Sequence, residues 1–177
     1  MKVGLFGGTF DPPHNGHLTV ARRVLDSGFV DQVWFLPCWK HAFGKDPSPY
    51  TTRVEMCKIL VKHEDHMFVS MMEGEVKSTY SVEILTAFKN NFPHTSFRLI
   101  LGSDNYWKMD EWKEKDKVLE LTPPIWVRRP GSKEIPEPFI YCDSFESSTE
   151  IRRMFQMLPR TVLAYILDRS SLYKEGQ

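Results

Sequence analysis

The sequence predicts an α/β fold in which helices flank a parallel sheet. Short apolar runs alternate along the chain with segments whose apolar residues recur at helical spacing. Turns rich in glycine or proline separate many of these segments. Strands that alternate with helices form βαβ units and pair in parallel, so we expect one sheet of five or six strands.

The first half of the chain supplies three of these strands. A strand is expected over residues 3–6, before a pair of glycines, and two prolines then hold the chain out of helix. A helix follows from Asn15 and stops at Gly28. The next expected elements are a strand over residues 33–36, a polar loop over 38–50, a helix capped by Thr51 or Thr52, and a strand over 67–71.

The second half continues the alternation. We expect a helix from Ser81, a strand over residues 97–101, a helix over 105–121, and strands over 125–127 and 139–141. Two helices, over about 148–157 and 160–168, end the chain. The whole chain, residues 1–177, therefore reads as a single Rossmann-like domain, with a small helical part from about residue 145.

Composition excludes several classes of protein. The 23 Lys and Arg residues balance the 23 Asp and Glu residues, so no basic surplus exists for coating nucleic acid or an anionic membrane. The three cysteines form no CxxC pair, which favours free thiols and a reducing, cytoplasmic setting. We expect no signal peptide, and no apolar run approaches the roughly 18 residues that a membrane helix needs.

The most informative segment runs from Gly7 to His17, between the first strand and the first helix. Glycines allow the backbone to approach a ligand, and a helix N-terminus favours phosphate. His14 and His17 are three residues apart, so both imidazoles can face a phosphorus that gains charge during a reaction. The alternatives are a tight turn with capping histidines, or a zinc site, for which no third ligand stands at motif spacing.

A second helix start lies at residues 146–153, Glu-Ser-Ser-Thr-Glu-Ile-Arg-Arg. Ser147 and Glu150 fit a capping box, which places exposed N–H groups and hydroxyls at this point. Arg152 follows one turn into the helix. Taken alone, the segment favours a well-capped surface helix, because capping boxes are common.

Together these motifs resemble a known family. Residues 9–17 resemble the (T/H)xGH signature of the nucleotidyltransferase superfamily, and residues 7–12 resemble the GGTFDP opening of nicotinate or nicotinamide mononucleotide adenylyltransferases. Residues 146–152 resemble the family's ISSTxIR motif, with Glu146 at a position that is usually apolar. The resemblance implies catalytic roles for His14, His17 and Arg152. It also implies that ATP is bound by Gly7, Gly8, Thr9, Phe10, His14, Gly16, His17, Arg129, Ser148, Thr149 and Arg152.

The middle of the chain carries the residues expected to bind the acceptor. Asp104 follows a buried strand, where an acid commonly accepts hydrogen bonds from ribose hydroxyls or caps a turn. By resemblance, Trp112 stacks on the pyridine ring and residues 78–85, similar to the family's SYTxDTL segment, hold the carboxyl or amide group. The mononucleotide-binding residues implied are Thr9, Lys45, Thr79, Tyr80, Asp104 and Trp112.

The resemblance implies adenylyl transfer from ATP to nicotinate or nicotinamide mononucleotide, giving a dinucleotide of the NAD class and pyrophosphate. Mg²⁺ is expected to arrive with ATP, without a dedicated metal site. The sequence leaves open the choice between the two acceptors and whether the protein is a homo-oligomer. Three alternatives remain: an enzyme acting on another phosphorylated acceptor such as phosphopantetheine, a non-catalytic nucleotide sensor, and a zinc-binding interaction module.

Overall fold

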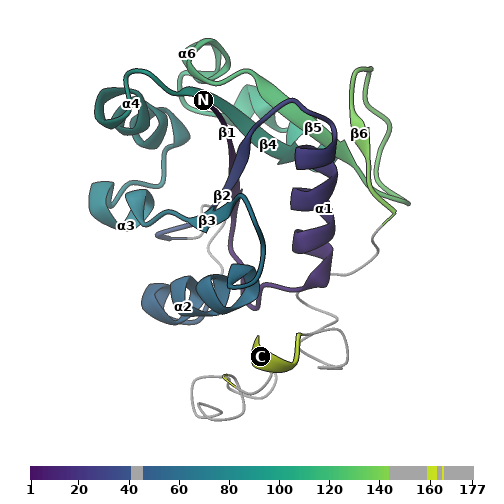
Figure 1. Cartoon of the computed structure of the whole chain (residues 1–177). Coiled ribbons are helices and arrows are strands. Elements are labelled where there is room, and N and C mark those ends of the chain that lie inside the picture. Colours follow the sequence, from purple (N-terminus) through teal and green to yellow (C-terminus); the bar gives the residue numbers. More distant parts are fainter. Residues whose placement is uncertain (41–45, 144–158, 163–164, 166–177) are drawn as a thin grey trace.

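A six-stranded sheet forms the centre of the molecule. The computed structural model describes residues 1–40, 46–143, 159–162 and 165. Every neighbouring pair of these strands is parallel, and their order in the sheet is β3-β2-β1-β4-β5-β6 (Figure 1). The predicted parallel sheet is thereby confirmed. The strands are β1 (Lys2–Gly8), β2 (Gln32–Pro37), β3 (Met67–Val69), β4 (Ser96–Gly102), β5 (Pro124–Arg128) and β6 (Ile140–Tyr141).

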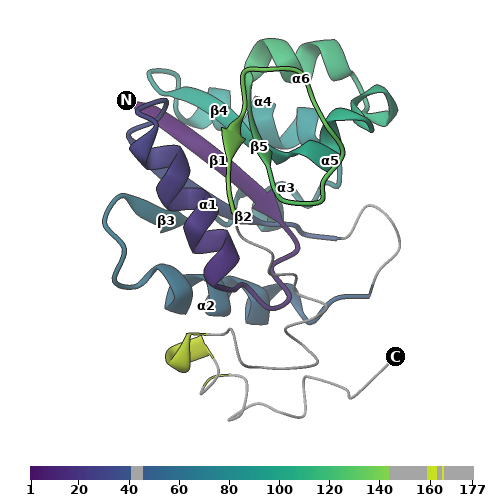
Figure 2. The same ribbon diagram turned by 90° about the vertical axis from the view of Figure 1, so that its right-hand side faces the viewer.

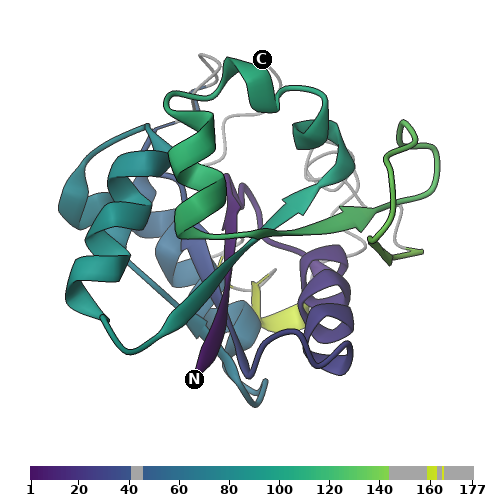
Figure 3. The same cartoon turned by 90° about the horizontal axis from the view of Figure 1, so that it is seen from above.

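Helices cover both faces of this sheet. Figures 1 and 3 show α1 and α2 on one face of the sheet and α4 and α6 on the other. In Figure 2, α1 lies along the sheet and α2 lies beyond the end of α1. The Rossmann-like prediction is therefore confirmed, with the strand order typical of that fold. The helices are α1 (Asn15–Asp26), α2 (Tyr50–Val61), α3 (Met72–Val76), α4 (Ser81–Asn91), α5 (Ser103–Tyr106), the 3₁₀ turn η1 (Met109–Glu111) and α6 (Lys115–Leu121).

Alternation along the strands divides the apolar residues into two clusters. Val33 and Phe35 of β2 face the cluster that contains buried residues of α1 and α2. Leu36 of β2 and Leu5 of β1 face the second cluster, which contains buried residues of α4 and α6. Because both sheet faces are covered, the inner strands consist mainly of apolar residues.

The first helix begins and ends where the sequence indicated. His14 is its N-cap residue, with an extended backbone, and the helix ends at Asp26. Gly28 then has a φ of +71°, a left-handed conformation that glycine adopts without a steric penalty. The short connection to β2 sets the position of α1 against the sheet, and so the position of its N-terminus.

The single helix predicted over residues 105–121 is wrong. The chain instead forms α5, η1 and α6, because the backbone leaves the helical conformation between them. Trp112 is extended, with φ −80° and ψ 133°, and Glu114 is left-handed, with a φ of +52°. The periodic apolar residues of this stretch still face the sheet, so periodicity alone could not locate the interruptions.

Three further local predictions need correction. Helix α2 begins at Tyr50 with Pro49 as its N-cap residue, so neither Thr51 nor Thr52 caps it. Strand β3 ends at Val69, two residues before its predicted end. Between the predicted strand over residues 67–71 and the predicted helix from Ser81, where no element was expected, the structure contains α3, whose five residues are too few for a helical period to stand out.

The predicted helix over residues 148–157 lies outside the described residues. Of the last predicted helix, residues 160–162 and 165 are described and helical, and Val162 is buried in the cluster beneath α1 and α2. All three cysteines fall within the described ranges and are free. No helix in the described part of the chain is long and apolar enough to cross a membrane.

Candidate active site

The predicted functional residues gather at the carboxyl ends of three adjacent strands. Strand β4 lies between β1 and β5, and the chain leaves β1 and β4 toward opposite sides of the sheet. Such a reversal opens a crevice beyond the strand ends, which is where parallel sheets bind nucleotides. Residues 9–17 follow β1, Asp104 follows β4 and Arg129 follows β5. The topology therefore brings together residues that are more than 100 positions apart.

Two glycines leave the backbone uncovered at this crevice. A Cβ atom added at Gly7, in β1, or at Gly102, at the end of β4, would meet no other atom within 4 Å. Gly8 differs, because its Cβ would lie 3.0 Å from the Phe10 ring. Gly7 and Gly102 thus leave open space for a ligand, whereas Gly8 permits local packing.

Phe10 is part of the core rather than of the site surface. Its side chain is 1% exposed, and its ring centroid lies 5.6 Å from that of Phe6 and 5.4 Å from that of Phe35. A positive φ of 51° turns the backbone sharply at this residue. The predicted contact of Phe10 with ATP is consequently limited to its backbone, and the buried ring anchors the turn that leads to the histidines.

His14 and His17 lie side by side at the start of α1. Their ring centroids are 3.7 Å apart, and the backbone N–H of His14 donates a hydrogen bond to Nδ1 of His17 at 3.1 Å. The His17 ring also packs against Phe10, with centroids 4.9 Å apart. Gly16, in the same first turn, is buried. Both imidazoles are therefore held beside free N–H groups at the positive end of a helix dipole.

Burial keeps both histidines neutral near pH 7. Desolvation, and then the charge of Arg129, lower the pKa of His14 to about 4. Burial is also the main reason why the pKa of His17 is well below its usual value, and the charges of His14 and Arg129 add to it. Since Nδ1 of His17 accepts a hydrogen bond, its proton is on Nε2. Nδ1 of His14 is buried and has no hydrogen-bond partner among the residues that the structure describes.

Arg129 supplies the positive charge at this site. One of its terminal nitrogens lies 3.6 Å from a carboxylate oxygen of Asp104, and its charge acts on both histidines. The side chains of Arg129 and Asp104 are 43% and 63% exposed, so both are accessible to a ligand. The structure thus places a predicted ATP-binding residue against a predicted mononucleotide-binding residue.

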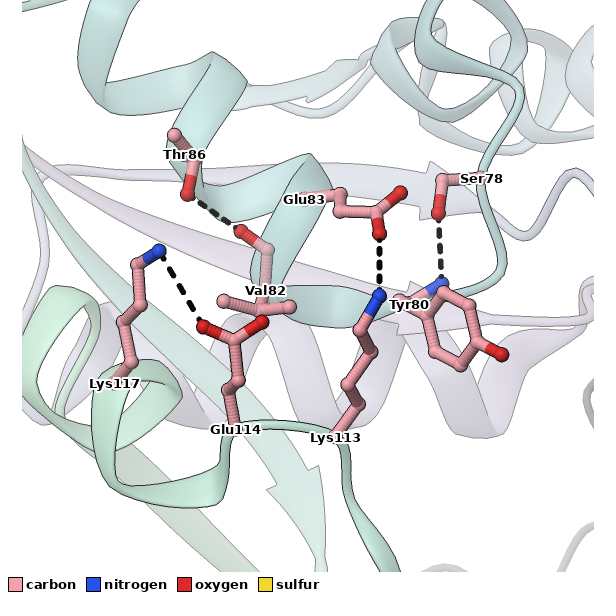
Figure 4. A network of polar contacts seen from close by, with 8 residues as sticks. All are labelled: Ser78, Tyr80, Val82, Glu83, Thr86, Lys113, Glu114 and Lys117. Atoms are coloured by element: carbon pink, nitrogen blue, oxygen red, sulfur yellow. Dashed lines mark hydrogen bonds and ion pairs between the residues drawn. The ribbon is translucent and has the colours of Figure 1, made fainter.

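The residues predicted to hold a pyridine ring come from two other segments. Thr79 and Tyr80 precede α4, and Tyr80 is 49% exposed. Trp112 follows η1 and packs partly buried against the cluster beneath α4 and α6. Lys113 bridges the two segments, since its Nζ lies 2.9 Å from Oε1 of Glu83 in α4 (Figure 4).

Several predicted residues lie outside the described part of the chain. These are Lys45, Glu146, Ser148, Thr149 and Arg152. Within the described ranges, no three His, Cys, Asp or Glu side chains lie close enough together to hold a metal ion.

Sequence reasoning gave no role to Arg53, which the structure places under the crevice. Its side chain is 1% exposed, and its guanidinium donates hydrogen bonds of 2.8 Å to the carbonyl oxygens of Thr9, Cys38 and Ser48. It therefore joins the loop after β1 to the end of β2 and to the start of α2. The sequence signal that could have identified Arg53 is an arginine at an inward position of a helix. A buried charge requires hydrogen-bond partners, so such an arginine indicates a structural role.

Glu73 is the second residue that sequence reasoning missed. It accepts a hydrogen bond of 2.7 Å from the backbone N–H of Trp39, and burial raises its pKa to about 7. Beside it, Trp39 packs edge-on against Tyr50, with ring centroids 5.1 Å apart. These aromatic residues and Arg53 contribute to the lining of a cavity of about 320 Å³.

Comparisons with known proteins agree with this geometry. The family model described as cytidylyltransferase-like matches residues 5–154. A nicotinate-nucleotide adenylyltransferase of Bacillus subtilis is 34% identical to the chain over 98% of both proteins. A probable nicotinate-nucleotide adenylyltransferase of Bacillus licheniformis is also 34% identical, over 86% of the chain and 84% of the relative.

Solved structures share the fold. The nicotinic acid mononucleotide adenylyltransferase of Plasmodium falciparum, complexed with NaAD, has a TM-score of 0.82 at 19% identity, over 97% of both chains. The same enzyme complexed with APC has a TM-score of 0.80. Fold and crevice together define a nucleotidyltransferase-type domain. The chain belongs to the cytidylyltransferase-like family and, within it, to the nicotinate-nucleotide adenylyltransferases.

Proposed function

We propose that this enzyme transfers the adenylyl group of ATP to nicotinate mononucleotide, forming nicotinate adenine dinucleotide and pyrophosphate. The observation that carries the proposal is the pair of histidines at the N-terminus of α1, facing Arg129 across the crevice between β1 and β4. Relatives named nicotinate-nucleotide adenylyltransferase, 34% identical over 98% and 86% of this chain, support nicotinate mononucleotide as the acceptor.

The reaction needs no covalent enzyme intermediate. An oxygen of the acceptor's 5′-phosphate forms a bond to the α-phosphorus of ATP, while the bond from that phosphorus to the β-bridging oxygen breaks. Pyrophosphate leaves with the electron pair of the broken bond. The acceptor phosphate is already a competent nucleophile, so the protein contributes position and charge stabilisation.

The histidine pair fits this task because it is poised to gain charge. Each neutral imidazole retains one N–H donor, and the bound triphosphate's negative charge raises the pKa of both rings. Arg129 adds a fixed positive charge nearby. We assign Arg152, Ser148 and Thr149 to the β- and γ-phosphates, where a guanidinium would offset the charge on departing pyrophosphate.

The acceptor occupies the other half of the crevice in this proposal. Thr9 and Lys45 bind its phosphate, and Asp104 accepts hydrogen bonds from ribose hydroxyls. Tyr80 and Thr79 hold the pyridine carboxylate, and the positively charged ring stacks on Trp112. Mg²⁺ enters as part of the ATP substrate, where it neutralises phosphate charge.

The domain organisation and the cellular compartment are also part of the proposal. We propose that residues 1–177 act as one catalytic domain, whose part from about residue 145 completes the ATP site. The three free thiols suit the reducing cytoplasm.

The test is pyrophosphate release from ATP and Mg²⁺ with nicotinate mononucleotide, nicotinamide mononucleotide and phosphopantetheine in parallel. We expect turnover with nicotinate mononucleotide and the highest kcat/KM for that acceptor. A higher kcat/KM with nicotinamide mononucleotide would correct the acceptor but keep the reaction. Turnover with phosphopantetheine alone would overturn the pyridine assignment. ATP binding without turnover would indicate a nucleotide sensor.

A further inference from the structure

Lys113 connects two segments of the proposed acceptor site that are distant in the sequence. Its ammonium lies 2.9 Å from the Glu83 carboxylate and 4.2 Å from the centroid of the Tyr80 ring (Figure 4). Lys113 adjoins Trp112 in the chain, and Glu83 lies one helical turn beyond Tyr80. One side chain thus reaches from the tryptophan segment to the tyrosine segment.

The contact at Glu83 extends to the backbone of Tyr80. Hydrogen bonds from Lys113, and then from the Ser78 hydroxyl, lower the pKa of the Glu83 carboxyl group. The same Ser78 oxygen accepts a hydrogen bond of 3.0 Å from the backbone N–H of Tyr80. A continuous series of polar contacts therefore runs from Tyr80 through Ser78 and Glu83 to Lys113.

The segment around Lys113 lacks the regular hydrogen bonds of a helix. The backbone N–H of Trp112 bonds to the carbonyl of Met109, which ends η1, and Glu114 is in the left-handed conformation before α6 begins. The ion pair between Lys113 and Glu83 of α4 therefore restricts the movement of this segment, which its own backbone hydrogen bonds do not. Loss of the interaction would loosen Trp112 and Tyr80 relative to each other.

We propose that the Lys113–Glu83 ion pair positions Trp112 and Tyr80 for the pyridine ring and thereby sets the affinity for the mononucleotide. Both members are positioning residues that act through the two aromatic side chains. The proposal rests on the proposed function, because it assumes that these aromatic residues bind the acceptor. It adds a determinant outside the residues that touch the ring.

The test compares Lys113→Met and Glu83→Gln with the wild-type enzyme. Because an exposed ion pair contributes only modestly, we expect the KM for nicotinate mononucleotide to rise about threefold to fivefold. The KM for ATP and kcat should stay within about twofold of the wild-type values, because the residues proposed to bind ATP and to stabilise the transition state lie elsewhere. Raising the ionic strength to about 0.5 M should shrink the difference between wild type and variants.

A matched control is available in the same region. Lys117 forms an ion pair of 3.5 Å with Glu114, and its exposure of 51% is close to the 44% of Lys113 (Figure 4). That pair joins neighbours on one segment, so Lys117→Met should leave every kinetic constant unchanged. The charge-swapped double variant, Lys113→Glu with Glu83→Lys, should restore the wild-type KM, which no direct role of Lys113 on the substrate would allow.

The possible outcomes separate this proposal from the proposed function. Three results would overturn the role of the ion pair: an unchanged mononucleotide KM in both single variants, an equal rise of that KM in Lys117→Met, or a charge-swapped variant whose KM stays raised. Turnover by the wild-type enzyme would still support the proposed function in each case. Absence of wild-type turnover, together with no calorimetric binding of nicotinate mononucleotide, would overturn both. Isothermal titration of the variants should reproduce the KM differences as differences in Kd.

Discussion

The backbone N–H of His14 donates a hydrogen bond of 3.1 Å to Nδ1 of His17, which holds the His17 ring at the start of α1 with its centroid 3.7 Å from that of the His14 ring. That bond also fixes the tautomer of His17, whose remaining proton on Nε2 is free to contact a phosphate oxygen. Burial against Phe10 restrains the ring further. The arrangement is prepared before any ligand arrives, as charge stabilisation in a transition state requires.

His17→Ala should therefore impair the chemical step. We expect kcat to fall at least about 100-fold, which is the usual loss when one preorganised donor is removed. Pyrophosphate release under saturating substrates measures this, and circular dichroism checks that the variant is folded. A retained kcat with only an increased KM would contradict a role in the transition state.

Trp112→Ala should weaken the acceptor more than ATP. Stacking of a cationic ring on an indole contributes about 1–2 kcal/mol when desolvated, so the KM for the mononucleotide should rise about tenfold. Trp107→Ala is the matched control, because Trp107 is 50% exposed and its Nε1 donates to the carbonyl of Glu134, outside the predicted acceptor site. Equal losses for both substrates in Trp112→Ala would refute ring stacking at this residue.

Alternating patterns were sufficient to predict the sheet and the helix that begins at Asn15. The apolar composition of a strand and the glycine that ends a helix are local features, so they can be recognised in the sequence without the rest of the structure. The interruptions near Trp112 and Glu114 were not predictable in this way. They accompany the packing of α6 against α4, which is a tertiary property.

Part of the candidate site was predictable for a similar reason. His14 and His17 are close in sequence, and helical spacing alone placed them together. The contact of Arg129 with Asp104 depends on two adjacent strands, so only the strand order could bring them into proximity. The role of Arg53 was missed because its partners are backbone carbonyls, which carry no residue-specific signal.

Arg53→Met should destabilise the fold severely. The substitution leaves three carbonyl oxygens without their donor, and each buried unsatisfied group costs about 1–3 kcal/mol, so we expect a loss of about 3 kcal/mol or more. Arg53→Lys should recover only part of this, since one ammonium cannot reproduce the planar geometry. Urea unfolding measures both. Arg22→Met, which removes an exposed ion pair with Glu64, should cost less than about 1 kcal/mol.

Glu73→Gln should make the protein more stable at high pH. The pKa of Glu73 is raised from 4.5 to about 7, so the folded state binds a proton more tightly than the unfolded chain and loses stability as pH rises between these values. The neutral amide avoids that loss, which is on the order of 3 kcal/mol at pH 8. Urea unfolding at pH 5 should show little difference between the proteins. An equal difference at both pH values would contradict a titrating Glu73.

His14→Gln should change the pH dependence in the opposite direction. The pKa of His14 is lowered from 6.5 to about 4, so the unfolded chain binds a proton more tightly than the folded protein. Acidification from pH 6.5 to pH 4 therefore removes on the order of 3 kcal/mol from the free energy of unfolding, a loss that the uncharged glutamine does not suffer. In wild type this loss is offset by the gain at Glu73, so the effect of His14 is isolated by comparing Glu73→Gln with the double variant that carries both substitutions. Between pH 7 and pH 4, the free energy of unfolding should fall less in the double variant than in Glu73→Gln, and an equal fall would show that His14 is solvated in the folded state.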